Sequence, residues 1–586
     1  GTFQHFLFEH RLYSRGVRAY FTTRNSAGSF LLMALFAALV LSLHDFKNHK
    51  SDLPLLFQIL AYCLVVTLIL LGLALTKSKG AIIGLFFAAA VFIILLLFGN
   101  RLKALRKLIL VVCLLLVIAG TCGIAWYGLN HNRLPGGNSM LVRWQYWKAS
   151  AKMYADHFLT GVGPGNFVHF YPHYKPAEAL ETVADPHNFP LSILTQYGPI
   201  GLFGFLAMIF LPLWKIKASN VTTSQPEIQQ SRPALRTKLI IFILIFWVAL
   251  LLAIHLVMPA ATIDNLLVVI YMILRFFIPH LVAFTVAFLL LTTNNKIKSE
   301  ASTITGNTTN ILFCAILGVT IHNLVDFAIF EPGVFTVFWT IIGCIIAIDF
   351  QNNRRSEFTY TPQRCVKIPM ALAGVIVIWA YLNYALIPVA KTTAKTQLAN
   401  VAMSTGQLEY AHHILDSATE DDPLSSAAPS LNGKLYLHHF KLTSSVNHDL
   451  LLQAEKCLQT AIQRNSAAFK NYERLTEVYT QLADISKKQE KINWLNKAFE
   501  KADYSVKFLY PGCARLRIEM AKIAEQLGKI DIAVKEYKKA IEIEDSYRLQ
   551  FQEMYPEREE VVSRIDEDQY MFAKQRLKLH RDQLNQ

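Results

Sequence analysis

The sequence predicts an all-α protein, in which a polytopic bundle of transmembrane helices is followed by an external α-helical repeat domain. Three observations predict this fold class. Hydrophobic residues make up 53% of the 586 residues and charged residues only 17%, with a mean hydropathy of +0.32. The apolar residues are gathered into runs close to the roughly 20 residues that a helix needs to cross a hydrocarbon core. After residue 390 the chain becomes charged and rich in alanine, leucine and tyrosine.

Residues 1–28 are expected to form an external or interfacial N-terminal segment. They contain no apolar signal core and no small-residue cleavage site, so we expect the sequence to be truncated, with earlier spans upstream. Four arginines lie in this segment: Arg11, Arg15, Arg18 and Arg24. Two interpretations stay open, namely a basic collar at the membrane surface and a set of external cations that face an anionic substrate. In the second interpretation Arg24 binds substrate.

The membrane domain is predicted over residues 29–390. About ten apolar segments in it are long enough, or nearly so, to cross a bilayer as helices. These segments are approximately 29–45, 53–75, 80–98, 107–129, 190–213, 238–258, 266–292, 311–328, 334–349 and 367–390. The polar stretch "HNLVDFAIFEPG" favours two spans over one kinked span in the region 311–349.

The distribution of lysine and arginine predicts how the chain is oriented across the membrane, because short cytoplasmic loops carry an excess of both. Four loops have such clusters, at 99–107, 214–238, 293–310 and 350–367. The large loop 130–189 and everything after residue 390 therefore fall on the external side. The net charge of +15 comes mostly from loop lysines and arginines of this kind, which set the topology. Since no RNA- or DNA-binding module accompanies it, we expect no nucleic-acid partner.

A helical repeat domain is predicted over residues 395–586. In its clearest unit, 516–545, a first helix ends near Leu527-Gly528. A second helix places three residues at helical spacing: Ala533, Tyr537 and Ala540. This unit resembles a tetratricopeptide repeat, and weaker copies at 398–424 and 450–502 predict about three to four repeats. Such repeats would form a concave surface for a peptide, a glycan or a partner protein. An unspecialised helical bundle is the alternative.

The eight cysteines show no CxxC and no Cys/His ligand spacing. Most of them lie in or beside apolar segments and are interpreted as small core residues. Cys457 and Cys513 lie in the tail, on the oxidising side of the predicted membrane, and whether they pair with each other stays open.

The loop 130–189 holds the densest set of polar and aromatic residues. From Arg143 the stretch "RWQYWKASAKMYADHF" repeats tryptophan, alanine and tyrosine at three- and four-residue steps, which predicts a short amphipathic helix at the membrane surface. The glycines and proline of "GVGPGNF" that follow are interpreted as shaping a turn. No lysine with serine or threonine follows them as in a nucleotide-binding loop, so nucleotide binding is not expected.

The end of this loop, "ADPHNF", places Asp185, His187 and Asn188 at the mouth of the next span. A neutral imidazole there is a candidate proton acceptor. Tyr171 and Tyr174 are candidates for stacking on sugar rings, with interfacial anchoring as the alternative. The run "HFYPHY" around them contains two histidines, but a proline interrupts it and organised carboxylates are missing, so no metal site is predicted.

The order of these motifs resembles the O-antigen ligase and polysaccharide polymerase superfamily over residues 20–350. Arg143, before an interfacial helix, is followed by "GVGPGNF", "PHNF" and then "LSILTQYGPIGLFGF" entering the membrane. The stretch "FTTRNSAGSFL" is similar to the family's asparagine-containing entry to a span, and "HNLVDFAIFEP" to its late His/Asp segment. One motif departs from the family. Ser78-Lys79-Gly80 stands where members often carry Ser-Arg-Gly, and lysine lacks the two-pronged donor geometry of arginine.

The resemblance implies a glycosyltransferase of the bacterial cytoplasmic (inner) membrane, with its large loop and its tail in the periplasm. It would move a glycan from an undecaprenyl-diphosphate carrier to an acceptor hydroxyl outside the cytoplasm, with inversion and without a metal or other cofactor. Arg143 and Lys79 would balance the charge of the diphosphate leaving group. His187 would accept the hydroxyl proton, with Asp185 or a backbone carbonyl orienting its ring and Asn188 binding substrate nearby. The acceptor is a glycan, a lipid or a protein side chain. For Arg143 an interfacial anchor, and for Lys79 a plain span-end lysine, are the alternatives.

Asp326 is an acid close to a span end, where it either caps the span or has a function. His322 precedes it by one helical turn, so we expect the two to share a helix face and to pair. Two other classes of protein stay open for the whole chain. One is a polytopic transporter, and the other is a scaffold for glycan assembly that recruits partners through its repeats.

Overall fold

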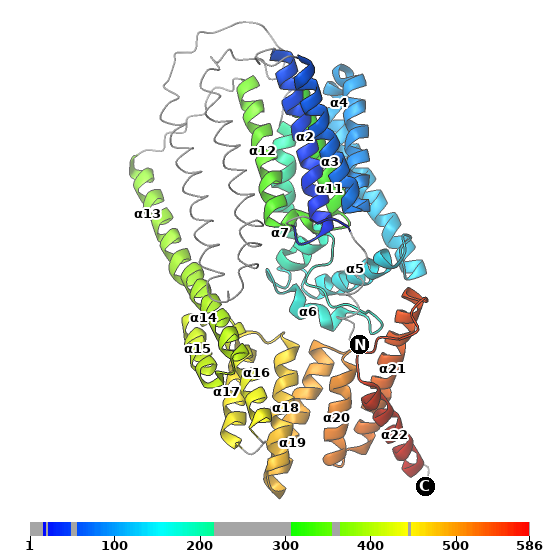
Figure 1. Cartoon of the computed structure of the whole chain (residues 1–586), viewed down its shortest axis with the longest axis vertical. Helices are drawn as coiled ribbons and strands as arrows, with labels where there is room; N and C mark the ends of the chain where they lie inside the picture. The colour runs from blue at the N-terminus through cyan, green and yellow to red at the C-terminus, as the bar shows by residue number, and fades with distance from the viewer. Residues whose placement is uncertain are drawn as a thin grey trace. The chain divides into compact units, whose positions relative to one another are not determined.

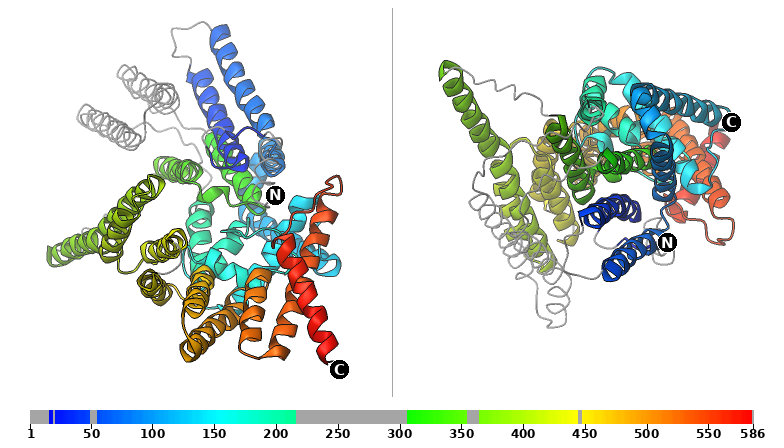
Figure 2. Two further views of the ribbon diagram at one scale, coloured as in Figure 1. Left: turned by 60° about the horizontal axis from the view of Figure 1, so that its bottom comes forward. Right: turned by 90° about the horizontal axis from the view of Figure 1, so that it is seen from above.

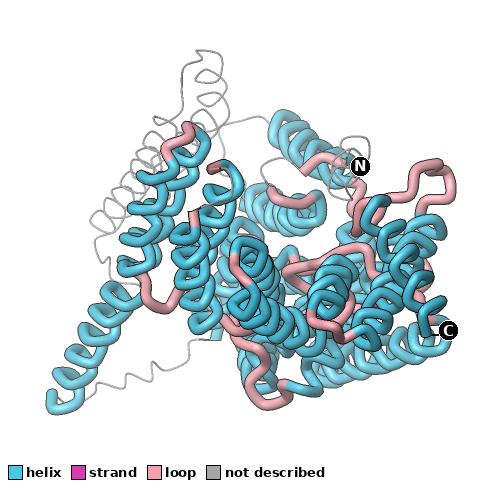
Figure 3. The backbone as a smooth tube through the Cα atoms, turned by 90° about the horizontal axis from the view of Figure 1, so that it is seen from below, coloured by secondary structure: helices cyan, strands magenta, loops and turns pink. Residues whose placement is uncertain are grey.

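The structure is a computed structural model that describes residues 16–18, 21–48, 55–215, 306–353, 364–443 and 447–584. Over these residues the regular secondary structure is entirely helical (Figure 3). The predicted spans 238–258 and 266–292, and most of the N-terminal segment 1–28, lie outside the described residues. Almost all described residues belong to one compact unit, formed by Gly1–Lys217 and Asn307–Gln586. The all-α fold class is confirmed.

The apolar segments form the helices of the membrane part. They are α2 (Arg24–Asn48), α3 (Leu55–Thr76), α4 (Lys79–His131), α7 (Phe189–Lys215), α11 (Gly306–Asn323), η4 (Ala328–Phe330), α12 (Pro332–Asn353) and α13 (Arg364–Tyr381). Five stretches are long and apolar enough to cross a membrane: Arg24–Leu43, Leu56–Thr76, Lys79–Phe98, Phe189–Pro212 and Ile368–Ser404. Two shorter apolar helices cover Thr308–Asn323 and Pro332–Ile348. All these stretches overlap predicted segments, but the predicted total of about ten spans is not confirmed.

The longest helix, α4, has 53 residues and would be about 80 Å long if it were straight. Its cap Ser78 bonds to Asn25, and near its other end it packs against Trp144. Asn25 and Arg143, the residue before Trp144, both contact the carboxylate of Asp326. The two ends of α4 are therefore close together, and α4 must reverse its direction between them. Residues 99–107, predicted as a loop, are helical. Their leucines, alanine, lysines and arginines are strong helix formers.

Helices α2, α3 and α4 lie side by side (Figure 1 and Figure 2). Helix α4 also crosses α11 at a pair of glycines. A Cβ on Gly84 would lie 2.5 Å from the carbonyl oxygen of Gly318, and one on Gly318 would lie 2.9 Å from that of Gly84. Small residues allow two helix backbones to approach this closely in an apolar bundle. The crossing brings the start of α4 to the end of α11, where the candidate site lies.

The chain breaks between α11 and α12, as the polar stretch "HNLVDFAIFEPG" predicted. Helix α11 ends at Asn323, the single turn η4 follows, and α12 begins at Pro332, a residue suited to the first helical position. The Asn323 amide donates to the preceding turn of α11 (2.8 Å), and its oxygen accepts from the N–H of Ile329 (2.7 Å). Asp326 lies inside this break, so the prediction that it shares a helix face with His322 is wrong.

Helix α7 is kinked where Gly198 adopts a φ of 68°. The next residue is a proline without an N–H, so the carbonyl of Thr195 lacks its helical partner. The loop "GVGPGNF" supplies the missing donors. The N–H of Val162 bonds to the Thr195 carbonyl (2.8 Å) and that of Gly163 to the next carbonyl (3.0 Å). All three glycines of this loop have positive φ, which confirms that the stretch shapes a turn.

The large loop forms two helices, α5 (Asn138–Asp156) and α6 (Phe167–Tyr174). Helix α5 is the helix predicted from the spacing of its aromatic residues. Its apolar side is buried in protein, because Tyr146 of α5 packs with Phe167 and Tyr171 of α6 in one buried cluster. The amphipathic pattern therefore reflects packing onto the rest of the loop and its neighbours.

The tail is a series of helical hairpins, as predicted. Its elements are η5 (Leu382–Leu386), α14 (Ile387–Ser404), α15 (Leu408–Asp421), α16 (Ala427–Leu442), α17 (His448–Arg464), α18 (Phe469–Ile485), α19 (Lys488–Tyr504), η6 (Ser505–Leu509), α20 (Ala514–Gln526), α21 (Ile530–Met554) and α22 (Glu567–Leu584). Helices α14 to α21 pair consecutively, and each pair packs on the next (Figure 1). Ala533, Tyr537 and Ala540 are fully buried, and Gly528, with a φ of 73°, makes the predicted turn. The thiols of Cys457 and Cys513 are free.

The large loop and the tail share a hydrophobic core, although they were predicted as separate regions. Leu180 of the loop packs in one cluster with Tyr547 and Phe551 of α21. Gln145 of α5 donates to Gln550 of α21 (3.3 Å), and both side chains are buried. The loop and the tail are therefore packed together as one body.

Candidate functional site

His187 has a backbone conformation that its neighbours hold in place. Its φ is 54°, in the left-handed region that residues other than glycine adopt at some strain. The carboxylate of Asp185 accepts hydrogen bonds from the His187 backbone N–H (2.9 Å) and from the hydroxyl of Ser192 (2.5 Å). The indole of Trp147 donates to the carbonyl of Pro186 (3.0 Å). The backbone that presents the imidazole is thus fixed by hydrogen bonds on both sides.

Asp185 and Asn188 hold the protein together around His187. Both oxygens of the Asp185 carboxylate are occupied by the bonds just described. The Asn188 amide donates to the carbonyl of Leu324 (2.8 Å), and its oxygen accepts from the N–H of Leu191 (3.0 Å) at the start of α7. In the structure both residues thus make contacts that position the backbone on either side of His187.

Asp326 is the residue at which separate segments meet. Its carboxylate accepts a hydrogen bond from the amide of Asn25 at the start of α2. It lies 3.5 Å from Nη2 of Arg143 on α5 and 3.9 Å from Nδ1 of His187. The side chain is only 2% exposed, and a buried carboxylate needs partners of this kind to remain ionised. Asp326, and not Asp185, is therefore the carboxylate that pairs with the imidazole.

Aromatic side chains confine the ring of His187. Tyr146 stacks on it with 5.8 Å between ring centroids, and Phe327 meets it edge-on at 4.6 Å. Its Nδ1 is buried and has no hydrogen-bond partner among the described residues. The side chain as a whole is still 29% exposed, so part of the ring remains open to an approaching molecule.

Arg143, the predicted cation, is part of this cluster. One terminal nitrogen donates to the hydroxyl of Ser139 (2.6 Å), and the other is the one that pairs with Asp326. Its Nε is buried without a hydrogen-bond partner within the described part of the chain. The side chain is 17% exposed. A donor that is buried and unused is available to a ligand that enters the site.

Lys79 and Arg24 lie beside the cluster. The hydroxyl of Ser78, directly before Lys79, donates to the side-chain carbonyl of Asn25 (2.8 Å), and Asn25 in turn donates to Asp326. This chain of bonds joins the starts of α2 and α4 to the carboxylate. The side chains of Lys79 and Arg24 are themselves exposed, so the two cations stand at the edge of the site.

His322 packs directly on the start of α4. It is 1% exposed, and its Nδ1 makes a hydrogen bond with the hydroxyl of Ser29 (2.8 Å). Gly80 provides the space, because a Cβ there would lie 2.5 Å from Cδ2 of His322. The glycine of the Ser78-Lys79-Gly80 motif is thus explained by a close approach of the α11 histidine.

The two tyrosines predicted to stack on sugars differ in their surroundings. Tyr171 is 0% exposed and stacks on Phe167 with 5.6 Å between centroids, so no face of its ring is open to a sugar in this structure. Tyr174 is half-buried, and burial together with the carboxylate of Asp156 raises its pKa. Among the described residues, no group of three His, Cys, Asp or Glu is placed to hold a metal ion.

The pKa values of the two aspartates of the site are shifted in opposite directions. Burial raises the pKa of Asp185 to about 6, against the hydrogen bonds from Ser192 and His187, which lower it. Burial also acts to raise the pKa of Asp326, but its contacts with His187 and His322 outweigh burial and lower it. Asp326 is consequently the anionic partner in the cluster at neutral pH.

Asn25, Ser78 and Tyr146 are site residues that sequence reasoning missed. A signal was present for two of them. Asn25 belongs to the stretch "FTTRNSAGSFL" and Ser78 to Ser78-Lys79-Gly80, and each is a polar residue at the entry to an apolar span, where polar groups are expensive. Tyr146 carried no such signal, since its pattern was that of an amphipathic helix.

Comparison with known proteins identifies the same region. A family model described as O-antigen ligase matches residues 64–206, a range that contains Ser78, Arg143 and His187. Residues 64–206 are therefore similar to the O-antigen ligase family, and this similarity supports a membrane glycan ligase or polymerase. No relative was found among curated proteins.

Several solved structures are similar to part of the chain. They include MamA (23% identity, 28% of this chain and 82% of that chain, TM-score 0.22). A second is a thermophilic TPR protein of Thermus thermophilus (17% identity, 32% and 99%, TM-score 0.22). A third is YrrB, a TPR protein with an unusual peptide-binding site (16% identity, 32% and 90%, TM-score 0.22). The hairpin series α14 to α21 itself defines the tail as a TPR-like helical domain.

Proposed function

We propose that this protein is a glycosyltransferase that moves a glycan from an undecaprenyl-diphosphate carrier to an acceptor hydroxyl on the external side of a bacterial cytoplasmic membrane. The observation that supports this proposal best is the meeting of Arg143, His187 and Asp326 in one cluster. Two of these residues belong to the segment that matches O-antigen ligases. A base, its anionic partner and a cation are the groups that transfer from a phosphate-linked donor requires.

His187 is the proposed base. In its neutral form it takes the proton of the incoming hydroxyl while the hydroxyl oxygen attacks the anomeric carbon of the donor. The bond from that carbon to the diphosphate breaks, and its electrons leave with the phosphate oxygen. Asp326 then stabilises the positively charged ring from its position 3.9 Å from Nδ1, a contact of the kind that tightens once substrate is bound. A single displacement of this type inverts the anomeric carbon.

Positive charge is the main requirement of the leaving group. A diphosphate is a stable anion, so it needs cations more than it needs a proton. Arg143 offers its unused Nε, and the exposed amine of Lys79 and guanidinium of Arg24 stand nearby. Because Asp326 already balances part of the Arg143 charge, Lys79 and Arg24 take a larger share than the sequence alone indicated.

The base is tested by His187→Ala in cells that carry no other copy of the gene, followed by analysis of the glycan product. We expect transfer to fall by about 10²-fold or more, at an unchanged amount of protein in the membrane. His131→Ala is the matched control, because His131 is an exposed histidine at the end of α4. Normal product from the His187→Ala protein would remove the base from the mechanism.

Arg143→Lys separates a diphosphate clamp from an interfacial anchor. Lysine keeps the charge and the reach but cannot present a planar fork to a phosphate or to Asp326. We expect the clamp to lose about tenfold or more of its transfer rate, measured with a defined lipid-linked donor. An anchor would tolerate the change, so full activity would assign Arg143 to the membrane surface.

A further inference from the structure

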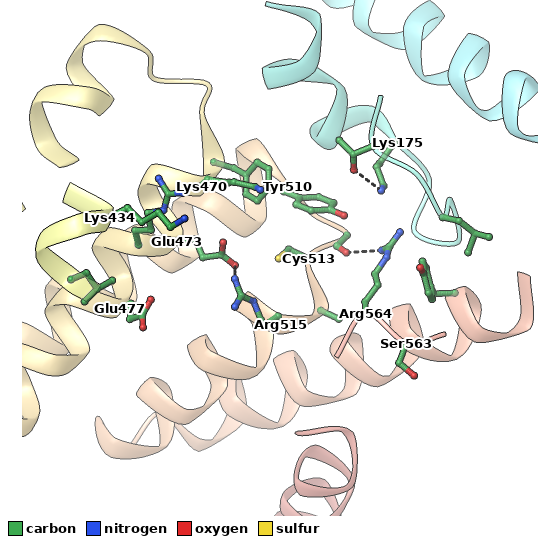
Figure 4. Close-up of a pocket in the computed structure, with 18 of the residues that line it drawn as sticks. Lys175, Lys434, Lys470, Glu473, Glu477, Tyr510, Cys513, Arg515, Ser563 and Arg564 are labelled. Carbon is green, nitrogen blue, oxygen red and sulfur yellow. Dashed lines mark hydrogen bonds and ion pairs between the residues drawn. The ribbon is translucent and has the colours of Figure 1, made fainter. Parts of the chain in front are cut away.

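A basic cavity of about 650 Å³ lies between the large loop and the helical repeats (Figure 4). Its lining comes from the segment after α6, from α16, α18 and α21, from the start of α20 and the turn before it, and from the segment before α22. Seven of the lining residues are lysine or arginine and two are glutamate. The volume is in the range of small-ligand sites, and no step of the proposed reaction takes place there.

Two cations have no carboxylate partner at the end of the cavity next to the large loop, which we call its loop side: Lys175 of the loop, and Arg564 of the tail, which donates to the loop's Ala179 carbonyl. Lys175 is 6% exposed, and its amine donates only to two neutral oxygens of its own loop, at 3.2 and 3.1 Å. The guanidinium of Arg564 donates to backbone carbonyls. Figure 4 shows the two charged groups pointing toward each other beside Tyr510. In the described part of the chain, neither takes part in an ion pair.

Placing these two charges together has an energetic consequence. Burial lowers the pKa of Lys175 well below its usual value, and the charge of Arg564 lowers it further. A charge on the buried amine of Lys175, beside the half-buried guanidinium of Arg564, is therefore costly unless an anion joins them. Charge-assisted hydrogen bonds from lysine and arginine are the means by which proteins hold carboxylates and phosphates. The pair therefore has the geometry and the unbalanced charge of an anion site.

The glutamates on the tail side leave the cavity basic. Glu473 pairs with Arg515 at 2.6 Å and Glu477 with Lys441 at 2.5 Å, so each is already balanced. Lys434 and Lys470 also line the cavity and are exposed. Among the described residues, no carboxylate pairs with either amine. Cations thus face the cavity from the loop side and from the tail side.

We propose that this cavity binds an anionic saccharide, whose carboxylate or phosphate groups pair with Lys175 and Arg564 on the loop side and with Lys434 and Lys470 on the tail side. The inference rests on the proposed function and deepens it, since a glycan is what the site transfers. Lys175 opens the segment that runs on to His187. A saccharide held here consequently contacts the same loop that presents the base.

The lining favours a saccharide over an acidic peptide. Of its apolar residues, Leu180, Leu437, Tyr510 and Tyr547 are each at most 8% exposed, because they are packed into the protein. The surface that a ligand meets is polar and apolar in about equal parts, and its polar part carries an excess of lysine and arginine over glutamate. A peptide gains much of its affinity from apolar side chains in pockets, whereas a charged sugar chain needs the donors that are present.

Binding is measured by titration calorimetry on the full chain in detergent, with hexagalacturonate as the anionic saccharide probe. Maltohexaose has the same length without charge, and a hexaglutamate peptide has comparable charge without sugar rings. A sugar-1-phosphate serves as the phosphate arm. We expect hexagalacturonate to bind with a dissociation constant that rises with ionic strength, and maltohexaose and hexaglutamate to bind at least about tenfold more weakly.

The double variant Lys434→Ala/Lys470→Ala tests the location without touching the packed loop side. We expect it to fold normally and to weaken hexagalacturonate binding by about five- to tenfold. The matched control is Lys456→Ala/Lys535→Ala, which removes two exposed lysines of the same domain that do not line the cavity. Lys175→Met adds a loop-side test, with folding checked by its melting temperature.

Three outcomes overturn the inference. Tighter binding of hexaglutamate would make the cavity a peptide site, equal binding of maltohexaose would exclude anion recognition, and equal weakening by the control variant would place the ligand elsewhere. The titration is repeated with His187→Ala, which should bind normally. If the wild-type protein does not bind hexagalacturonate but transfers glycan normally in cells, this inference alone is contradicted. Intact binding with His187→Ala transferring normally would contradict the proposed base alone.

Discussion

At the residue scale, Asp326 decides how the site is charged. Arg143 and His187 are both basic groups, and without an anion between them each would disfavour a charge on the other. The carboxylate lies within 4 Å of both and is tied to Asn25 on a third segment. It can therefore hold Arg143 in place and stabilise a protonated His187 at different moments of one reaction.

Replacement of Asp326 by asparagine removes the negative charge while it preserves the size of the side chain. We expect glycan transfer to fall by about 10²-fold or more, because Arg143 is left unbalanced and the protonated imidazole loses its partner. Product length and yield in cells provide the measurement. Asp484→Asn, at an exposed position of α18, is the control. Transfer within about twofold of wild type would assign Asp326 to a purely structural role.

Asp185 predicts a pH dependence of stability. Its pKa in the folded protein is about 6, above the roughly 3.9 of an unfolded aspartate, so the folded state holds the proton more tightly. Its contribution to stability is complete below about pH 4 and is lost as the pH rises through about 6. Asp185→Asn removes this titration. The melting temperature of wild type minus that of the variant should therefore fall across this window, and a rising difference would contradict the burial of the carboxyl.

The residues of the site were predicted as far as local pattern allowed. His187 and Arg143 stand in recognisable motifs, and their approach to each other is the result of the fold. The role of Asp326 was not predictable from one sequence, because it depends on a contact with Asn25 across 301 positions and on where α11 ends. Asp185 and Asn188 were placed correctly beside His187, but their hydrogen bonds, to the His187 N–H and Ser192 for Asp185 and to Leu324 and Leu191 for Asn188, depend on the fold and could not be predicted.

At the element scale, the kink of α7 helps to fix the position of His187, which lies two residues before this helix. Gly198 has a φ of 68° and faces the carbonyl of Leu159, to which a Cβ would lie 2.3 Å. The glycine-rich loop bonds to the carbonyls freed at this kink. The start of α7, directly after His187, is thereby clamped to the large loop rather than to membrane helices alone.

Gly198→Ala should destabilise this clamp. The positive φ and the contact with Leu159 both oppose a side chain, so we expect a loss of about 1–3 kcal/mol in stability and a fall in transfer as His187 is displaced. Gly204→Ala on the same helix is a matched control, because a Cβ there meets nothing within 4 Å. Melting temperature and transfer are measured for both. Equal behaviour of the two variants would show that the kink does not position His187.

Elements were predictable where their signal is local. The apolar runs and the hairpins of the tail follow from periodicity over a few turns, and Gly528 marked a turn by its residue type alone. The continuation of α4 through 99–107 was not predicted, because charge was taken as the sign of a loop although these residues favour a helix. The polar stretch predicted the break after Asn323, but it did not show that α11 ends before Asp326.

At the scale of the whole molecule, the large loop and the tail act as one packed body. Leu180 from the loop and Tyr547 and Phe551 from α21 share a cluster, and the basic cavity lies in the same region. No sequence pattern indicated this contact, since the apolar residues on each side fit equally well into a core of their own region. A shared core gives the repeats a mechanical connection to the segment that ends at His187.

Leu180→Ala tests that connection at a distance from the chemistry. Leu180 is 6% exposed, and its truncation should cost about 2–5 kcal/mol of stability through the cavity that it leaves. Because this loosens the loop between Lys175 and His187, we expect faster hydrogen exchange in that loop and a lower transfer rate. The control is Leu424→Ala, which is the same change at a tail residue that is 79% exposed. If exchange in the loop accelerates while transfer stays at the wild-type rate, the tail stabilises the loop without positioning His187, and the base is held by Asp185, Trp147 and the α7 clamp alone.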